Sequence, residues 1–246
     1  MGNVLQIEAL KWRRSPLVWV TLASTLATPL LATLLFGFAE GREPTWHDLL
    51  NQALLIHTMM IGPLVTTLIG ASAISTEYQF DTWKLSLTAP IKRWQVYTAK
   101  LGVSLIWCLA LSVAALLGTM VGGSLLHLGP FERFWYWAYQ WLIGGAGLAI
   151  MLPFYHLVTF VSRSFFVTSG AGIVGTFTGI LMVSSKWAGY YPIASVPLLL
   201  AIWFNSRPGE VQSLVGTQPV WLLCLAATFL LPLLINLVFV KRADLT

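Results

Sequence analysis

The sequence predicts an all-α integral membrane protein with six transmembrane helices. Hydrophobic residues make up 57% of the 246 residues and charged residues only 9%, whereas a typical soluble domain has about 25% charged residues. Apolar runs of roughly 20 residues recur, and a helix of that length crosses a hydrocarbon core of about 30 Å. Residues 1–246 are therefore expected to form a single transmembrane domain, without room for a soluble catalytic domain.

The first element expected is a helix within residues 1–16 that lies in the cytoplasmic interface. In the stretch GNVLQIEALKWRR, apolar residues fall near one side of a helix, and Glu8, Lys11 and Arg14 lie elsewhere. Such a helix places its basic side chains at anionic headgroups. The apolar run 17–39 that follows has no small-residue cleavage pattern, so we expect a retained span rather than a signal peptide.

Five further spans follow the first one. They are predicted at residues 52–74, 97–121, 134–161, 165–184 and 219–240. Residues 40–50 and 122–133 form outer connections, and the Gly62-Pro63 pair is expected to break the second span. The aromatic cluster at residues 134–141 is typical of a membrane-interface belt. Residues 185–218 are expected to form an outer re-entrant or interfacial element, although 187–204 can also be read as a seventh span.

The distribution of basic residues predicts the orientation. With six spans and both termini in the cytoplasm, ten Lys and Arg residues lie in inner segments and four lie in outer segments. This asymmetry agrees with the positive-inside rule, and a seventh span would weaken it. We therefore expect a multi-pass protein of the bacterial inner cell membrane with both termini in the cytoplasm.

Few residues within the predicted spans suggest chemistry. Lys100 is the single charged residue in them, which disfavours an ion-coupled carrier. The chain lacks a GxxxxGK[ST] loop for ATP and an HExxH zinc motif. An intramembrane serine protease would need Ser169 with His57 or His156, and those two histidines are also the only pair for a haem. Both signals are weak, and no metal site or catalytic residue is predicted.

Small residues recur in the spans at spacings that favour close helix contact. Gly118 and Gly122 form one GxxxG pattern, Gly175 and Gly179 form another, and glycines crowd the fourth span. Packing within the subunit is the simpler interpretation. Contact with a second copy of the chain is the alternative.

The longest polar segment between two spans, residues 76–95, has the features of a docking element. Asp81 or Thr82 can cap a short helix that Pro90 ends, and Trp83 offers an apolar anchor beside the basic Lys92 and Arg93. A buried aromatic residue with a basic rim is typical of an interaction hot spot. A solvated loop that meets headgroups through Trp83 and Trp94 is the alternative.

Residues of this segment and of the N-terminal helix resemble a known signature. Glu77, Thr82-Trp83-Lys84, Leu87, Pro90, Arg93 and Lys100 resemble the E…GT(W)…L..P..R……K pattern after the second span of ABC type-2 permeases, especially the bacitracin-resistance and lantibiotic-immunity permease group. Glu8, Lys11 and Arg14 are similar to the E..K..R pattern of the family's first helix. Asp81 stands where the family commonly has Gly, so the turn there is expected to differ in shape.

The resemblance implies the permease half of an ATP-driven exporter. Two permease chains, identical or related, would sit on separate cytoplasmic ATPase subunits that hold ATP and magnesium, so no cofactor is expected on this chain. Residues 76–95 would be the cytoplasmic coupling loop that contacts the ATPase. The coupling residues implied are Glu77, Asp81, Thr82, Trp83, Pro90 and Arg93.

The family pattern further implies a substrate cavity lined by the second and fifth spans. Its candidate polar residues are His57, Thr58, Thr66, Thr67, Thr176 and Thr178. Because none of them carries a fixed charge, we expect a hydrophobic or amphiphilic substrate, such as an antimicrobial peptide, a lipid or another natural product. Two alternatives stay open: a non-transporting scaffold or sensor that recruits a cytoplasmic partner, and an intramembrane enzyme. No nucleic-acid partner is expected.

Overall fold

The computed structural model describes residues 2–37, 45–80, 92–131, 133–182, 185, 190–191 and 218–242. All regular elements in these ranges are helical, which confirms the predicted all-α fold. The helices are α1 (Gly2–Arg13), α2 (Leu17–Gly37), α3 (Trp46–Ile56), the π-helical turn η1 (His57–Ile61), α4 (Gly62–Gln79), α6 (Arg93–Leu125), α7 (Phe134–Ala149), α8 (Leu152–Ser162), α9 (Phe165–Met182) and α11 (Gln218–Arg242).

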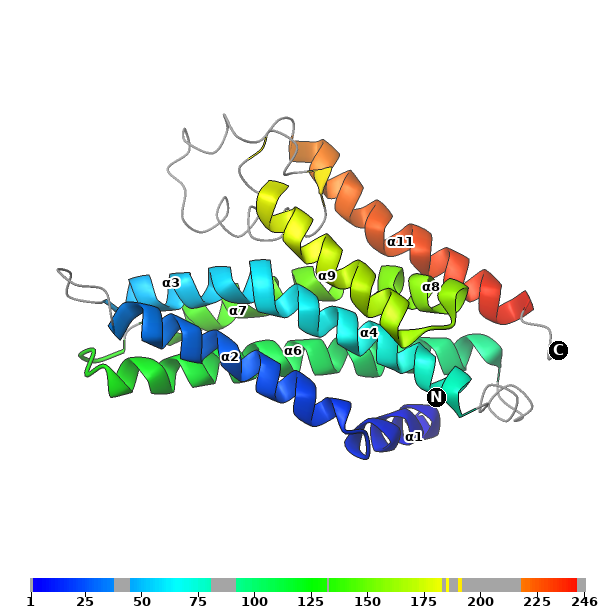
Figure 1. Cartoon of the computed structure of the whole chain (residues 1–246), viewed down its shortest axis with the longest axis horizontal. Coiled ribbons are helices and arrows are strands. Elements are labelled where there is room, and N and C mark those ends of the chain that lie inside the picture. The colour runs from blue at the N-terminus through cyan, green and yellow to red at the C-terminus, as the bar shows by residue number, and fades with distance from the viewer. Residues whose placement is uncertain are drawn as a thin grey trace.

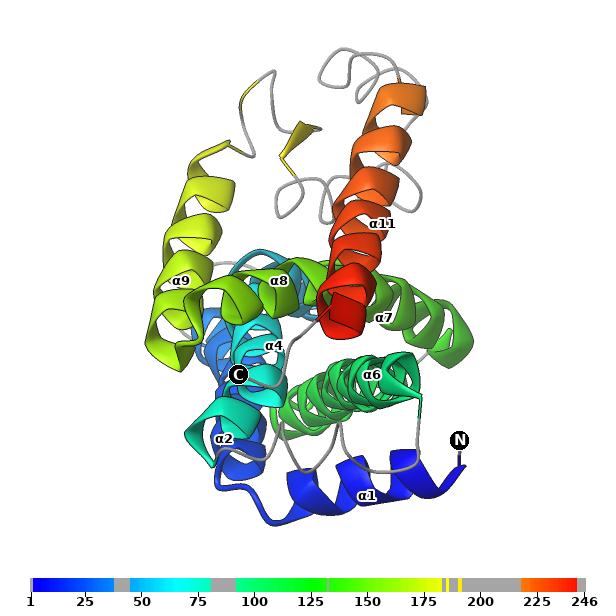
Figure 2. The ribbon, with the colours of Figure 1, turned by 90° about the vertical axis from the view of Figure 1, so that its right-hand side faces the viewer.

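Six helical stretches within the described ranges are long and apolar enough to cross a membrane, as predicted. They are Leu17–Phe36, Trp46–Gln79, Arg93–Leu125, Phe134–Ser162, Phe165–Met182 and Leu223–Lys241. In Figure 1 α2, α4 and α6 run along the long axis of the molecule, and α9 and α11 lean across them. Figure 2 shows α1 beside α6 at the edge of this bundle. The expected re-entrant element at 185–218 and the possible span at 187–204 lie almost entirely outside the described residues.

The second span is longer than predicted and is not broken. It begins at Trp46, where Thr45 caps α3 by accepting a hydrogen bond from the Asp48 backbone N–H, so residues 46–50 are helical and not part of an outer loop. The Gly62-Pro63 pair lies just after the π-helical turn, in which the Gly62 N–H donates to the His57 carbonyl. A Cβ on residue 62 would lie 2.4 Å from that carbonyl oxygen, so the wide turn requires glycine. Pro63 is tolerated because it falls in the first turn of α4.

Two other predicted boundaries also change. Helix α6 extends from Arg93 to Leu125, so the predicted outer turn at 122–133 begins four residues too early. The fourth span is divided into α7 and α8 by a turn at Ile150 and Met151. Helix α8 ends at Ser162, and the C-cap residue Arg163 has a left-handed backbone conformation with φ of 53°. The apolar stretch continues through the turn at 150–151, which is why the pattern alone predicts one continuous helix.

The glycines of α6 bring α2 and α3 into close contact with it. A Cβ at Gly118 would lie 2.8 Å from the Pro29 ring, and one at Gly122 would lie 2.1 Å from Thr33 Oγ1. Gly123 accommodates the indole of Trp46 in the same way. The Gly118/Gly122 pattern therefore serves packing within the subunit. On α7, Gly145 similarly lies against Ser112 of α6.

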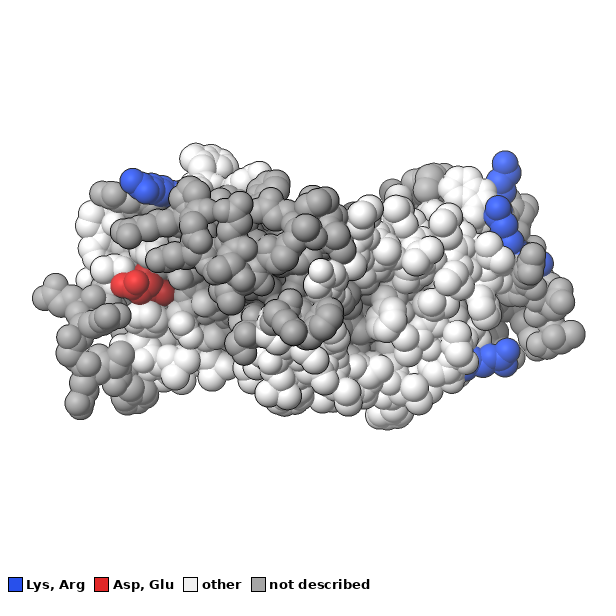
Figure 3. Space-filling view, turned by 90° about the horizontal axis from the view of Figure 1, so that it is seen from above, with Lys and Arg blue, Asp and Glu red and all other residues white. Residues whose placement is uncertain are grey.

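Charged side chains on the visible surface gather at the two ends of the bundle. On the face seen in Figure 3, basic residues occupy the end that carries the C-terminus in Figure 1, whereas an acidic patch and a further basic patch lie at the opposite end. The long middle of the molecule shows neither sign of charge among its described residues on this face. This distribution is that of a membrane-spanning bundle with polar caps.

Candidate functional site

An ion cluster joins three helices at the end of the bundle where α4 ends and α6 begins. Lys100 of α6 donates to Glu77 Oε1 of α4 at 2.6 Å and to Glu8 Oε2 of α1 at 2.8 Å. Lys11 of α1 donates to the same Glu77 oxygen at 2.7 Å and to Glu8 Oε1 at 3.0 Å. Two carboxylates and two ammonium groups thus form one cluster with matched charges. Its most distant members in the sequence, Glu8 and Lys100, are 92 positions apart. We call Glu8, Lys11, Glu77 and Lys100 the ion cluster.

Most of the ion cluster is removed from solvent. The side chains of Glu77 and Lys100 are each 2% exposed, whereas that of Lys11 is 43% exposed. Partial burial acts to lower the pKa of Lys11, but the hydrogen bond to Glu77 and the charges of both glutamates outweigh it and raise the pKa above 10.5. Lys11 therefore stays charged at neutral pH. Separating the members of such a cluster would leave uncompensated buried charges, so the three helices are expected to move together.

The local sequence explains how these residues meet. Glu8 and Lys11 lie three positions apart on α1 and so share a helix face. Glu77 belongs to the last turn of α4, and Lys100 lies two turns into α6, where a helix end and a helix start can approach each other. From the sequence, these four residues were identified only as separate positions of two motifs. It missed the cluster because the predicted spans ended before Glu77, although the matched signs of the four charges were a usable signal.

The ion cluster lies next to the predicted coupling loop. Of the predicted coupling residues, Asp81, Thr82, Trp83 and Pro90 lie outside the described residues. Glu77 is buried in the ion cluster, which means that it faces the other helices and not the surface. Arg93 begins α6 and donates from Nη1 to the Lys241 carbonyl oxygen at 3.2 Å, which links the start of α6 to the end of α11. Near the two ends of the loop, Glu77 thus contacts α1 and α6, and Arg93 contacts α11.

His57 and Thr58, two of the predicted cavity residues of the second span, are buried among the helices. His57 is buried and contacts Ser112 Oγ of α6 at 3.1 Å and Thr28 Oγ1 of α2 at 3.5 Å, and its ring lies 5.2 Å from that of Trp141. Thr58 is fully buried and donates to the Leu54 carbonyl of its own helix. These two residues lie in the helix packing around η1.

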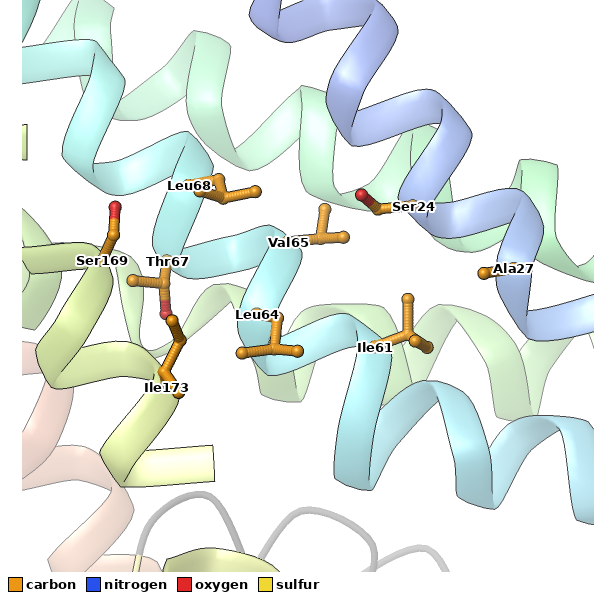
Figure 4. Close-up of a pocket in the computed structure, with 9 residues that line it drawn as sticks. All are labelled: Ser24, Ala27, Ile61, Leu64, Val65, Thr67, Leu68, Ser169 and Ile173. Atoms are coloured by element: carbon orange, nitrogen blue, oxygen red, sulfur yellow. The ribbon is translucent and has the colours of Figure 1, made fainter. Parts of the chain in front are cut away.

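Thr67 lies in a lateral cavity formed by α2, α4 and α9. The cavity has a volume of about 340 Å³ and is lined mainly by apolar residues, with Ser24, Thr67 and Ser169 as its polar members. Figure 4 shows these side chains between the three helices, with Ser24 on α2 and Ser169 and Ile173 on α9. The walls of this cavity come from α4 of the second span, α9 of the fifth span and α2 of the first span.

The remaining predicted cavity residues do not line this cavity. Thr66 is buried beside Cys108 of α6, at 3.8 Å between Oγ1 and Sγ. Thr176 is buried and donates to the Gly172 carbonyl, and Thr178 hydrogen-bonds the Tyr191 hydroxyl at 2.5 Å. Thr67 is therefore the one predicted cavity residue that contacts this space in the described part of the chain.

The alternative enzyme sites are not assembled in the described residues. Ser169 Oγ has no hydrogen-bond partner there, so it is not paired with His57 or with His156. Neither ring nitrogen of His156 has a partner, and its ring meets Tyr97 edge to face at 5.8 Å. Among the described residues there is also no group of three His, Cys, Asp or Glu side chains that could hold a metal ion.

Comparison with known proteins decides the family. The family model for ABC-2 family transporter proteins matches residues 4–179, which is most of the chain and includes the ion cluster and the cavity. The chain belongs to the ABC-2 transporter family. The resemblance predicted from the first helix and the loop after the second span is thereby confirmed.

Similarity to a known permease supports the assignment of this chain to the ABC-2 family. The chain is similar to the bacitracin transport permease protein BCRB of Bacillus licheniformis, with 24% identity over 193 residues that cover 76% of this chain and 87% of that protein. The coarse function follows: the ABC-2 permease is a membrane component of a transporter, and its described residues include six helices apolar enough to span a membrane.

Proposed function

We propose that this ABC-2 permease is the transmembrane subunit of an ATP-driven exporter that moves hydrophobic or amphiphilic molecules, such as antimicrobial peptides, across the bacterial cell membrane. Two permease chains would assemble with two cytoplasmic ATPase subunits, which would dock on residues 76–95. Both termini would then face the cytoplasm. The observation that carries this proposal is the ion cluster beside the docking segment.

The ion cluster supports a mechanical role for its end of the bundle. A displacement of the segment between residues 80 and 92 acts directly on α4 and α6, which hold its two ends. Because Glu77 and Lys100 bind each other and both bind α1, such a displacement would move α1, α4 and α6 as one unit. ATP-driven closure of the ATPases favours one arrangement of the permease only through contacts that differ between two states.

The lateral cavity supports the proposed class of substrate. None of its lining residues in the described part of the chain is charged, and its walls are largely leucine, isoleucine, valine and alanine side chains. An apolar or amphiphilic molecule would lose little by leaving the membrane for such a space, whereas a sugar phosphate or a metal ion would lose its hydration without compensation. The similarity to a bacitracin transport permease agrees with a peptide substrate.

Copurification from the native host tests the assembly. The chain would be isolated in mild detergent, and bound proteins would be identified by mass spectrometry. We expect a P-loop ATPase, whose hydrolysis in lipid nanodiscs rises when a peptide substrate is added. Recovery of the chain alone after crosslinking would contradict the exporter, and an ATPase that no substrate stimulates would favour a scaffold or sensor.

A double substitution tests the docking segment. Trp83→Ala with Arg93→Ala should weaken ATPase copurification while the permease still elutes as a monodisperse species. Trp135→Ala is a suitable control, because Trp135 is 83% exposed on α7 and lies outside residues 76–95. If the double variant retains the ATPase as well as the control does, residues 76–95 are not the main docking element.

A further inference from the structure

A second, larger groove opens at the end of the bundle that carries the ion cluster. It has a volume of about 510 Å³, within the range of about 300–1,000 Å³ that is usual for small-molecule sites. Residues from α1, from the start of α2 and from the last turns of α4 line it. This groove is separate from the lateral cavity, and nothing in the proposed transport cycle requires it.

The charges around the groove favour an anion. The carboxylates of Glu8 and Glu77 are both neutralised within the ion cluster, by Lys11 and Lys100. Arg14 also lines the groove, is exposed, and forms no ion pair with any residue the structure describes. Lys11 uses two of its three N–H bonds on the glutamates and keeps one for a ligand. The groove thus offers a free guanidinium and an ammonium N–H beside neutralised acids.

The position and the walls of the groove favour a lipid over a soluble anion. It lies where α2 begins at Leu17 and α4 ends at Gln79, which is the headgroup level if these helices span the bilayer. Trp12, Leu17 and Phe80 supply apolar walls, and Phe80 is 75% exposed. A glycerophospholipid could cover these side chains with its glycerol and first methylene groups while its phosphate meets Arg14. Free phosphate would gain nothing from them.

We propose that this groove binds one anionic phospholipid per chain, with the phosphate on Arg14 and Lys11 and the acyl ends against Trp12 and Phe80. The bound lipid would join α1 to the ends of α2 and α4 on the side away from Lys100. The proposal requires that α2 and α4 span the membrane, but it does not depend on the transported substrate.

Lipid retention in native mass spectrometry tests the proposal. The transporter would be reconstituted in phosphatidylcholine nanodiscs with increasing phosphatidylglycerol, released into detergent, and the lipids that stay bound would be counted. Arg14→Gln removes the proposed phosphate ligand. Arg13→Gln is the matched control, because it removes the same charge from the neighbouring position, which does not line the groove.

The outcomes separate a built site from general attraction. We expect one tightly held phosphatidylglycerol per chain, about fivefold weaker retention in the Arg14 variant, and little change in the Arg13 variant. Equal weakening in both variants would mean general surface attraction and would overturn the proposal. Displacement of the lipid by millimolar inorganic phosphate would also overturn it, since the groove would then be a soluble-anion site. Lipid retention is measured without reference to ATPase association. The lipid proposal can therefore be contradicted while the proposed function stands, and the reverse.

Discussion

Lys100 Nζ lies 2.6 Å from Glu77 Oε1, and both side chains are 2% exposed. This pair joins the end of α4 to the beginning of α6 across a segment of the chain that begins at residue 81. A buried ion pair of this kind contributes little to stability by itself, but its rupture leaves a bare charge in a medium that solvates it poorly. The pair therefore constrains how its two helices can move apart.

Removing Lys100 should destabilise the permease strongly. Lys100→Met removes the buried ammonium that binds both glutamates, and we expect a loss of about 3–5 kcal/mol in the free energy of unfolding. Thermal unfolding in mild detergent measures this loss. Lys11→Met is the control, because the Lys11 side chain is 43% exposed and Lys100 would still bind both glutamates, so its loss should cost about 1 kcal/mol. Lys100→Met with Glu77→Gln should recover part of the stability, and equal behaviour of all three variants would contradict the role of buried charge.

The contact between α4 and α9 can be tested at a glycine. A Cβ at Gly172 would lie 2.2 Å from Thr67, whereas one at Gly170 meets nothing within 4 Å. Gly172→Ala should therefore push α9 away from α4 and cost about 1–3 kcal/mol. Gly170→Ala should be neutral to within about 0.5 kcal/mol. Comparable unfolding temperatures for the two variants would show that the helices separate without cost.

The opposite end of the bundle depends on Trp46. Its indole Nε1 donates to the carbonyls of Leu128 and Gly129, and its ring packs on Gly123. Trp46→Ala should cost about 2–3 kcal/mol, somewhat less than for a fully buried tryptophan. Trp135→Ala provides the comparison, since Trp135 is 83% exposed and its loss should cost about 0.5 kcal/mol or less. Chemical denaturation of both variants measures the two losses in the free energy of unfolding. A similar loss in each would contradict the role of Trp46 at this end of the bundle.

Filling the lateral cavity should impair transport without unfolding the protein. Ser24→Phe places a ring from α2 into the space shared with Thr67 and Ile173. We expect the substrate-stimulated ATPase activity of the assembled complex to fall at least fivefold, while the basal activity is retained. Val20→Phe adds a ring one turn earlier on α2, outside the cavity lining. If both variants respond to substrate equally, the cavity is not on the transport path.

Hydropathy was sufficient to predict the six spans found among the described residues and their order, because crossing a bilayer imposes a minimum apolar length. It placed helix ends poorly where polar residues continue a helix. Trp46, Glu77 and Arg93 all lie in helices beyond the predicted limits of their spans. Their polarity is compensated by contacts between helices, as with Glu77 and Lys100, and such contacts have no periodic signature in the sequence.

The candidate site was only partly predictable for a related reason. Thr58, Thr67 and Thr176 each donate a hydrogen bond to a carbonyl of their own helix, but of these three only Thr67 lines the cavity in the described part of the chain. From sequence alone, a threonine that faces a cavity looks the same as one that faces a neighbouring helix. The rotation of each helix decides between them, and packing against the neighbouring helices sets that rotation.

The π-helical turn at His57–Ile61 joins α3 and α4 into one span and shifts the helical register between them. A π-turn inserts one extra residue, which rotates everything after it by about 100° relative to an uninterrupted α-helix. The N-terminal half, α3, therefore packs on α2, α6 and α7, whereas the C-terminal half, α4, packs on α8 and α9 as well. Deleting a single residue within 57–61 would restore the ordinary helical register and turn Thr67 away from the space it now shares with α9. The position of the cavity thus depends on the exact number of residues in the span as well as on their identity, because one residue more or less changes which side chains face α9.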